Sequence, residues 1–157
     1  MVEETYFDHV VVANGHYSTP NIPDFEWLDK FKGRVVHSHE FRDGAEYKGQ
    51  NVIVIGSSLS AEDLASQLYK FGANKIILSH RKKTPIFESW PKGIEERPMI
   101  AEVDGKTVKF GNGDQGEYDA ILLCTGYKNR YAFLDDSLTL EAKNDFWLNN
   151  LGNGVMS

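Results

Sequence analysis

The chain has 157 residues and a mass of 17.8 kDa, which is the size of one ordinary domain. Seventeen Lys and Arg stand against 23 Asp and Glu, and the net charge of −6 argues against a general nucleic-acid-binding protein, because an acidic surface repels phosphate backbones. No apolar stretch is long enough to span a bilayer, and the single cysteine, Cys124, excludes an intrachain disulfide and favours a reducing, cytoplasmic environment.

Short β-branched runs alternate with helical or loop segments along the chain, which is typical of a mostly parallel α/β sheet. Residues 7–13, with a continuous apolar stretch at 10–13, predict a strand covered on both faces. A loop with two prolines and a short amphipathic piece at 25–31 follow, and residues 34–37 predict another brief strand.

The strongest predicted unit occupies residues 51–79. A buried strand at 51–55 is broken by a Gly-Ser-Ser turn, and apolar residues then recur at helical spacing from 59 to 71. Gly72 stands where a C-terminal capping glycine is expected, and residues 75–79 predict a second strand. Strand, turn, helix and strand together form a βαβ unit with a right-handed crossover.

The pattern changes after this unit. Residues 86–98 contain two prolines and mixed charges and predict a loop. Asp104-Gly105 separates two strand-like runs and predicts a hairpin, so that residues 100–118 form a small β-meander. Residues 118–124 predict a buried strand, and the last thirty residues read as loop. The expected fold is a Rossmann-like, three-layer α/β domain with a β-meander insertion.

A candidate dinucleotide-binding turn lies between the strand 51–55 and the helix, with the sequence Gly56-Ser57-Ser58-Leu59-Ser60-Ala61. Gly56 permits a sharp turn, and the small Ala61 allows the helix to pack closely on the strand. Ser58 replaces the usual middle glycine, but serine hydroxyls and the free amides of the helix N-terminus can donate hydrogen bonds to a phosphate. The alternative is a turn that only caps the helix.

The end of the second strand indicates which dinucleotide is bound. Arg81 stands 25 residues after Gly56, where NAD-binding proteins carry an acidic residue for the ribose hydroxyls. The stretch from Ser79 to Lys83 contains no acid, whereas Arg81 and Lys82 suit the 2′-phosphate of NADPH. We therefore expect NADPH rather than NADH; a solvated surface run is the alternative interpretation.

Several motifs together resemble the flavin-containing monooxygenase family. The FxGxxxHxxxF fingerprint is matched by Phe31, Gly33, His37 and Phe41, just before the candidate turn. The strand end Cys124-Thr125-Gly126-Tyr127 is similar to the family's later threonine-glycine motif. The serine-rich turn, Trp90-Pro91 and Glu96-Arg97-Pro98 are similar to the bacterial trimethylamine monooxygenase branch.

The resemblance implies an enzyme that uses NADPH to reduce FAD and then oxygenates a soft nitrogen or sulfur atom. The resemblance implies that Gly56, Ser58 and Ser60 contact the pyrophosphate and the adjoining ribose of NADPH. Ser57 and Leu59 belong to the same turn and are also expected to bind the cofactor. Arg81 and Lys82 take the 2′-phosphate, and Thr125 and Gly126 lie near the cofactor cleft. We expect His37 to hold a loop through hydrogen bonds, and we assign no catalytic residue and no metal ligand.

The family's first glycine-rich motif, which binds FAD, is not found in these residues. We therefore expect residues 1–30 to be a strand and linker that normally join an FAD-binding domain, and residues 31–157 to be an NADPH-binding domain. On this interpretation the chain is a piece of a longer enzyme, inactive alone, and FAD is bound only in the parent protein. The apolar run 7–13 would then contact the FAD-binding domain or support a homodimer.

The predicted function is the NADPH-binding domain of a monooxygenase that N- or S-oxygenates small nucleophiles such as trimethylamine. One alternative is the pyridine-nucleotide domain of another flavoprotein, such as a disulfide reductase, although the chain has no Cys-x-x-Cys pair. The other alternative is a non-catalytic Rossmann-like module in which the nucleotide-binding turn is vestigial.

Overall fold

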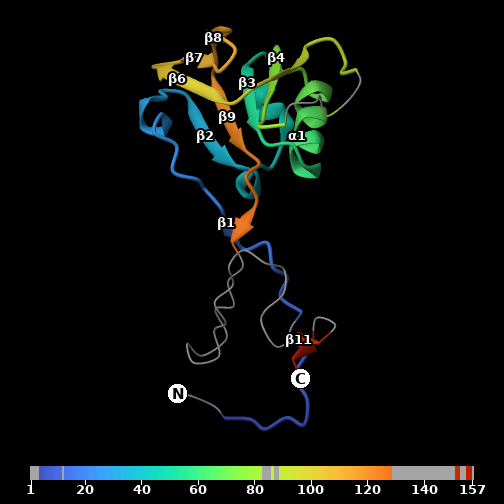
Figure 1. Cartoon of the computed structure of the whole chain (residues 1–157). Coiled ribbons are helices and arrows are strands. Elements are labelled where there is room, and N and C mark those ends of the chain that lie inside the picture. Colours follow the sequence, from blue (N-terminus) through green and yellow to red (C-terminus); the bar gives the residue numbers. More distant parts are fainter. Residues whose placement is uncertain are drawn as a thin grey trace. The chain divides into compact units, whose positions relative to one another are not determined.

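The computed structural model describes residues 4–11, 13–82, 86, 89–128, 151–152 and 155–156 (Figure 1). The chain divides into two units, one made of Pro20–Tyr127 and the other of Met1–Thr19 with Lys128–Ser157. All of the predicted site residues belong to the unit Pro20–Tyr127. In the other unit β11 (Leu151–Gly152) and β12 (Val155–Met156) pair antiparallel, and most of the predicted C-terminal loop lies outside the described residues.

The unit Pro20–Tyr127 is built on a five-stranded sheet in which every pair of neighbouring strands is parallel. In sheet order the strands are β2 (Arg34–His37), β9 (Ala120–Leu123), β3 (Asn51–Ile55), β4 (Lys75–Ser79) and β5 (Ile94–Arg97). The strands predicted at 34–37, 51–55 and 75–79 are confirmed, and the run 118–124 contains β9. Because β3, β4 and β9 are covered on both faces, their residues are almost all apolar and buried.

One face of the sheet is covered by α1 (Leu59–Lys70), which connects β3 to β4 as predicted (Figure 1). Its buried side chains recur at helical spacing, and they are Ala61, Leu64, Ala65 and Leu68. The helix ends in a Schellman motif, because the Ala73 N–H donates to Leu68 O at 3.0 Å and the Gly72 N–H donates to Tyr69 O at 3.1 Å.

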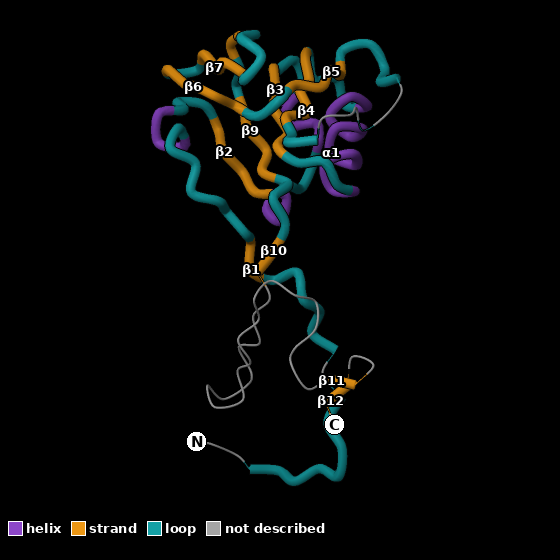
Figure 2. Tube along the Cα trace, viewed as in Figure 1, coloured by secondary structure: helices purple, strands orange, loops and turns teal. Residues whose placement is uncertain are grey.

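The other face of the sheet is covered by a three-stranded antiparallel meander, β6 (Ile100–Asp104), β7 (Thr107–Phe110) and β8 (Gln115–Glu117). Asp104 pairs with Thr107, so the hairpin loop consists of Gly105 and Lys106. The meander packs a second apolar cluster against the sheet, including Ile53, Ile77, Val108, Phe110 and Ile121. The predicted Rossmann-like α/β domain is confirmed, and the meander, which was predicted as an insertion, forms the third layer beside helix and sheet (Figure 2).

The remaining elements are short. They are β1 (Thr19–Pro20), which pairs with β10 (Tyr127–Lys128), and the 3₁₀ turns η1 (Leu28–Lys30), η2 (Ser38–Glu40) and η3 (Gly44–Tyr47). Within the described residues there is no helix with the length and apolar character needed to cross a bilayer.

The prediction of a buried strand at 7–13 is wrong. Residues 7–11 and 13 are described, and none of them lies in a strand. Phe7 is 73% exposed and Val10 is 76% exposed. A strand needs a neighbour to pair its N–H and C=O groups, and none of the described strands pairs with this run, so its apolar character alone does not make it extended and buried.

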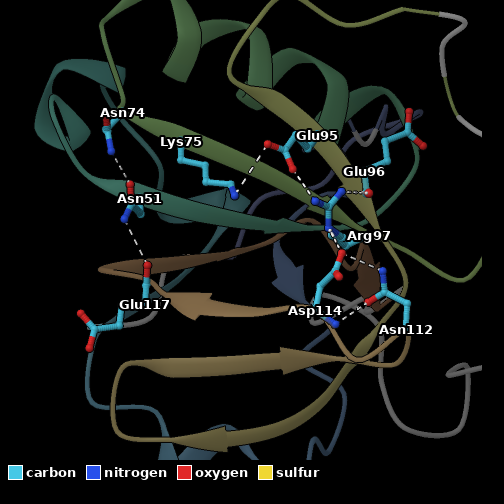
Figure 3. A network of polar contacts seen from close by, with 9 residues as sticks. All are labelled: Asn51, Asn74, Lys75, Glu95, Glu96, Arg97, Asn112, Asp114 and Glu117. Atoms are coloured by element: carbon cyan, nitrogen blue, oxygen red, sulfur yellow. Dashed lines mark hydrogen bonds and ion pairs between the residues drawn. The ribbon is translucent and has the colours of Figure 1, made fainter.

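The prediction of a loop at 86–98 is wrong at 94–97, which form β5. This strand carries one apolar residue followed by charges, because it lies at the edge of the described sheet and is stabilised partly by ion pairs. Figure 3 shows Glu95 between Lys75 and Arg97, with a Lys75 Nζ–Glu95 Oε1 distance of 3.6 Å. Arg97 also pairs with Asp114, with an Nε–Oδ2 distance of 2.8 Å.

Candidate functional site

The carboxyl ends of the parallel strands meet at one edge of the sheet, where β3 and β9 are neighbours. From β3 the chain passes through α1 to β4 on one side, whereas β9 is added much later on the other side. β3 and β9 are therefore neighbours in the sheet although they are far apart in the chain. Open α/β sheets bind ligands outside the carboxyl ends of their strands, where the strand order reverses.

Gly56 makes the turn out of β3 at this point. Its φ is +145°, and a Cβ atom on it would lie 2.6 Å from Cys124 O and 3.0 Å from Cys124 Cβ. Both the backbone conformation and the close approach to the end of β9 therefore require glycine. The Cys124 N–H donates to Ile55 O at 2.8 Å and fixes the two strand ends against each other.

The turn presents unpaired backbone donors. The N–H groups of residues 57–60 form no hydrogen bond with the described part of the chain. Ser58 is the N-cap of α1; its carbonyl accepts from the Ala61 N–H at 2.8 Å, whereas its hydroxyl makes no capping hydrogen bond. These donors stand at the positive end of the helix dipole, which is an environment that favours an anion.

The end of β4 brings a cation to the turn. Lys82 Nζ donates to Ser57 O at 3.0 Å, so two of the predicted site segments are in direct contact. Arg81 is exposed and forms no salt bridge with any described residue. Its guanidinium is therefore available to an anionic ligand.

Thr125 and Gly126 follow β9, next to Gly56, but their polar atoms bind the chain itself. The Thr125 hydroxyl donates to Asn21 O, and Asn21 Nδ2 donates to Thr125 O at 3.2 Å. The Gly126 carbonyl accepts from the Asn21 N–H at 2.9 Å and from His37 Nε2 at 3.0 Å. Sequence reasoning missed Asn21, whose partners lie more than a hundred residues away and leave no local signal.

The residues of the FxGxxxHxxxF fingerprint hold β2 in place through packing and hydrogen bonds. A Cβ on Gly33 would lie 2.5 Å from Asp119 O and 2.5 Å from the Phe31 ring, so glycine lets β2 approach β9. His37 donates from Nε2 to Gly126 O and accepts at Nδ1 from the His39 N–H at 3.1 Å, which fixes its tautomer. These hydrogen bonds hold the loop, as predicted, and burial lowers the pKa of His37, with the bond to Gly126 opposing the shift.

The buried thiol of Cys124 is unreactive, because burial raises its pKa to about 12. The described residues contain no group of His, Cys, Asp and Glu side chains that could hold a metal ion. On the described surface, a hollow of about 480 Å³ lies beside the start of α1 and is lined by Leu59, Glu62, Asp63, Ser66, Ser89, Trp90 and Pro91. Another, of about 670 Å³, lies on the meander side and contains none of the predicted site residues.

A family model described as flavin-binding monooxygenase-like matches residues 2–95 of the chain. The trimethylamine monooxygenases of Methylocella silvestris and Roseovarius nubinhibens are 47% and 46% identical to it over 149 residues, which are 95% of this chain and 33% of each relative. The crystal structure of Tmm from Pelagibacter sp. superposes with a TM-score of 0.81 at 44% identity, covering 89% of this chain and 32% of that one. The chain thus spans about a third of the length of the curated relatives it matches.

Proposed function

The chain belongs to the flavin-binding monooxygenase-like family, and we propose that it binds NADPH at the carboxyl edge of its parallel sheet. In this proposal it is the NADPH-binding part of a cytoplasmic, flavin-dependent monooxygenase that oxygenates a small nitrogen or sulfur nucleophile. Trimethylamine is the proposed substrate, because relatives 44–47% identical to the chain are named trimethylamine monooxygenases.

One observation carries the proposal: the turn at Gly56 and the amides after it that have no partner among the described residues. The residue has the backbone conformation of a glycine-only turn, contacts the end of β9 and opens a helix whose first amides are unpaired within the described chain. A pyrophosphate group fits this arrangement, because it accepts several hydrogen bonds and is attracted by the helix dipole. Ser58 stands where the motif usually has its middle glycine. The hydroxyls of Ser57, Ser58 and Ser60 would donate further hydrogen bonds to the phosphates.

The charge at the end of β4 supports NADPH over NADH. Arg81 is exposed without an ion pair in the described chain, and Lys82 already touches the turn through Ser57. We propose that Arg81 binds the 2′-phosphate and that Lys82 closes the turn and adds charge. Thr125 and Gly126 would shape the neighbouring wall through their bonds to Asn21 and His37. When bound, NADPH supplies the hydride that reduces a flavin.

In this proposal NADPH, and not the flavin, occupies the turn at Gly56. Among the described parallel strands only β3 ends in a glycine-containing turn that opens an α-helix. We therefore assign FAD to another part of the protein. The exposed side chains of Tyr6, Phe7, Val10 and Val11 are proposed to pack against that part, or against a second copy in a homodimer.

Calorimetric titration of the 157-residue chain with NADPH and with NADH tests the nucleotide assignment. We expect NADPH to bind at least about tenfold more tightly, which is about 1.4 kcal/mol, because a charge-assisted arginine–phosphate contact contributes that much or more. Replacement of Arg81 by Ala should weaken NADPH binding by a similar factor and leave NADH binding nearly unchanged.

Lys70→Ala is the matched control, because it removes the same charge at the C-terminal end of α1. Equal affinities for the two nucleotides in the wild-type chain would contradict the role of Arg81. Binding of neither nucleotide would instead favour a module whose turn is vestigial.

A further inference from the structure

We propose that Glu96 is a positioning residue that holds the segment of Arg81 and Lys82 in place and thereby sets the preference for NADPH over NADH. The inference rests on the proposed function, because it concerns how the nucleotide-selecting cations are presented. Glu96 lies on β5 and does not itself need to touch the nucleotide.

The side chain of Glu96 lies on the opposite side of β5 from those of its two neighbours. Figure 3 shows Glu95 and Arg97 directed toward the network with Lys75 and Asp114, whereas the carboxylate of Glu96 points away from it. Only 14% of the Glu96 side chain is exposed. A carboxylate this buried is costly unless several donors satisfy it, so its partners are part of the local design of the fold.

Among the described residues, three donors from the chain before β5 converge on this carboxylate. The Ile86 N–H donates to Oε1 at 3.0 Å and to Oε2 at 2.9 Å, and Trp90 Nε1 donates to Oε1 at 2.5 Å. His80 Nε2 donates to Oε2 at 2.7 Å. The Glu96 carboxylate therefore binds the imidazole of His80, the backbone amide of Ile86 and the indole of Trp90 at the same time.

These donors flank the nucleotide-selecting cations in the sequence. His80 directly precedes Arg81, and Ile86 and Trp90 follow Lys82. Both sides of the segment are thus tied to the same point on β5. An arginine that pairs with a phosphate binds best when its backbone is already fixed, because less conformational entropy is lost when the contact forms.

The hydrogen bonds of His80 also attach the residue before Arg81 to β5. A carboxylate only accepts hydrogen bonds, so Nε2 of His80 must carry a proton. Its Nδ1 is buried with no partner in the described chain, which leaves Glu96 as the ring's anchor there. The His80 N–H also donates to Arg97 O at 3.1 Å. The residue before Arg81 is therefore held to β5 through both its backbone and its ring.

An electrostatic role and a positioning role of Glu96 predict opposite changes in NADPH affinity when the residue is replaced. A direct through-space effect of the Glu96 charge on a 2′-phosphate is repulsive, so its removal would tighten NADPH binding. A positioning role predicts weaker NADPH binding, because the tie to His80, Ile86 and Trp90 is lost. The sign of the change therefore separates the two.

The test uses Glu96→Gln and Glu96→Asp in the 157-residue chain, titrated with NADPH and with NADH. Glu96→Gln removes the charge and one acceptor, whereas Glu96→Asp keeps the charge but is one methylene too short to reach all three donors. We expect both variants to weaken NADPH binding by about fivefold or more and to change NADH binding by less than about twofold. Glu95→Gln, the neighbour on the other side of β5, should leave the NADPH-to-NADH ratio unchanged.

Trp90→Phe is the milder variant if the Glu96 variants fail to fold. It removes the indole donor, keeps an aromatic ring, and should narrow the ratio by about two- to threefold. Tighter NADPH binding in Glu96→Gln, an equal loss for both nucleotides, or an unchanged ratio in all three variants would overturn the inference. A wild-type chain that does not prefer NADPH overturns the proposed function as well, so the two failures are distinguishable.

Discussion

Replacement of Gly56 by Ala should destabilise the protein and disrupt the site together. At φ +145° a non-glycine residue is strained by about 1–3 kcal/mol. The new Cβ would also lie 2.6 Å from Cys124 O, a backbone atom that cannot rotate away. Relief requires β3 or β9 to shift, and overpacking of this kind costs about 1–3 kcal/mol. We therefore expect a loss of about 2–6 kcal/mol in the free energy of unfolding.

Thermal unfolding followed by circular dichroism measures the first part of this prediction. For a unit of about 100 residues the loss corresponds to a Tm lower by on the order of 10–30 °C. Gly113→Ala is the matched control, because Gly113 has φ +90° and nothing within 4 Å of the added Cβ. That variant carries backbone strain without a collision, so the difference between the two variants reports the contact with β9.

NADPH titration of Gly56→Ala measures the second part. Since the shift displaces the amides that follow Gly56, the affinity should fall by about tenfold or more. A Gly56→Ala protein that unfolds at the same temperature as Gly113→Ala would refute the steric argument. Unchanged NADPH affinity in a folded variant would refute the assignment of this turn to the pyrophosphate.

Two further predictions concern buried polar groups. Tyr47→Phe should leave the free energy of unfolding unchanged or raise it by up to about 1 kcal/mol in urea titration, because the buried Tyr47 hydroxyl has no partner among the described residues; a clear loss would reveal one. His37 has a pKa lowered by burial, so between its folded pKa and the ordinary value of 6.5 the unfolded chain binds more protons than the folded chain. The free energy of unfolding should therefore fall as the pH drops below about 6.5, and His37→Gln should flatten that dependence; equal slopes in both proteins would contradict it.

The βαβ unit could be predicted from the sequence because its signals are local. The strand before Gly56, the helical spacing after it and the glycine at 72 each depend on residues within a few positions. The same holds for the hairpin at Asp104. These elements position the turn and Arg81, so much of the candidate site follows from short-range patterns.

The parts that were missed depend on partners distant in the sequence. Thr125 and Gly126 are conspicuous in the sequence, but only the folded chain shows that Asn21 and His37 use their polar atoms. The strand β5 has no apolar alternation, because ion pairs rather than burial hold its exposed side. The run 7–13 has the opposite character: its composition favours a strand, but no neighbour in the described chain pairs with it.

The charged edge of the sheet has a consequence for behaviour at high concentration. β5 is hydrogen-bonded on one side only within the described sheet, and an open row of backbone groups is a template on which a second molecule can add a strand. The closely spaced charges of Glu95 and Arg97, tied to Lys75 and Asp114, make such an addition unfavourable. These side chains therefore help to keep separate copies from polymerising along the sheet.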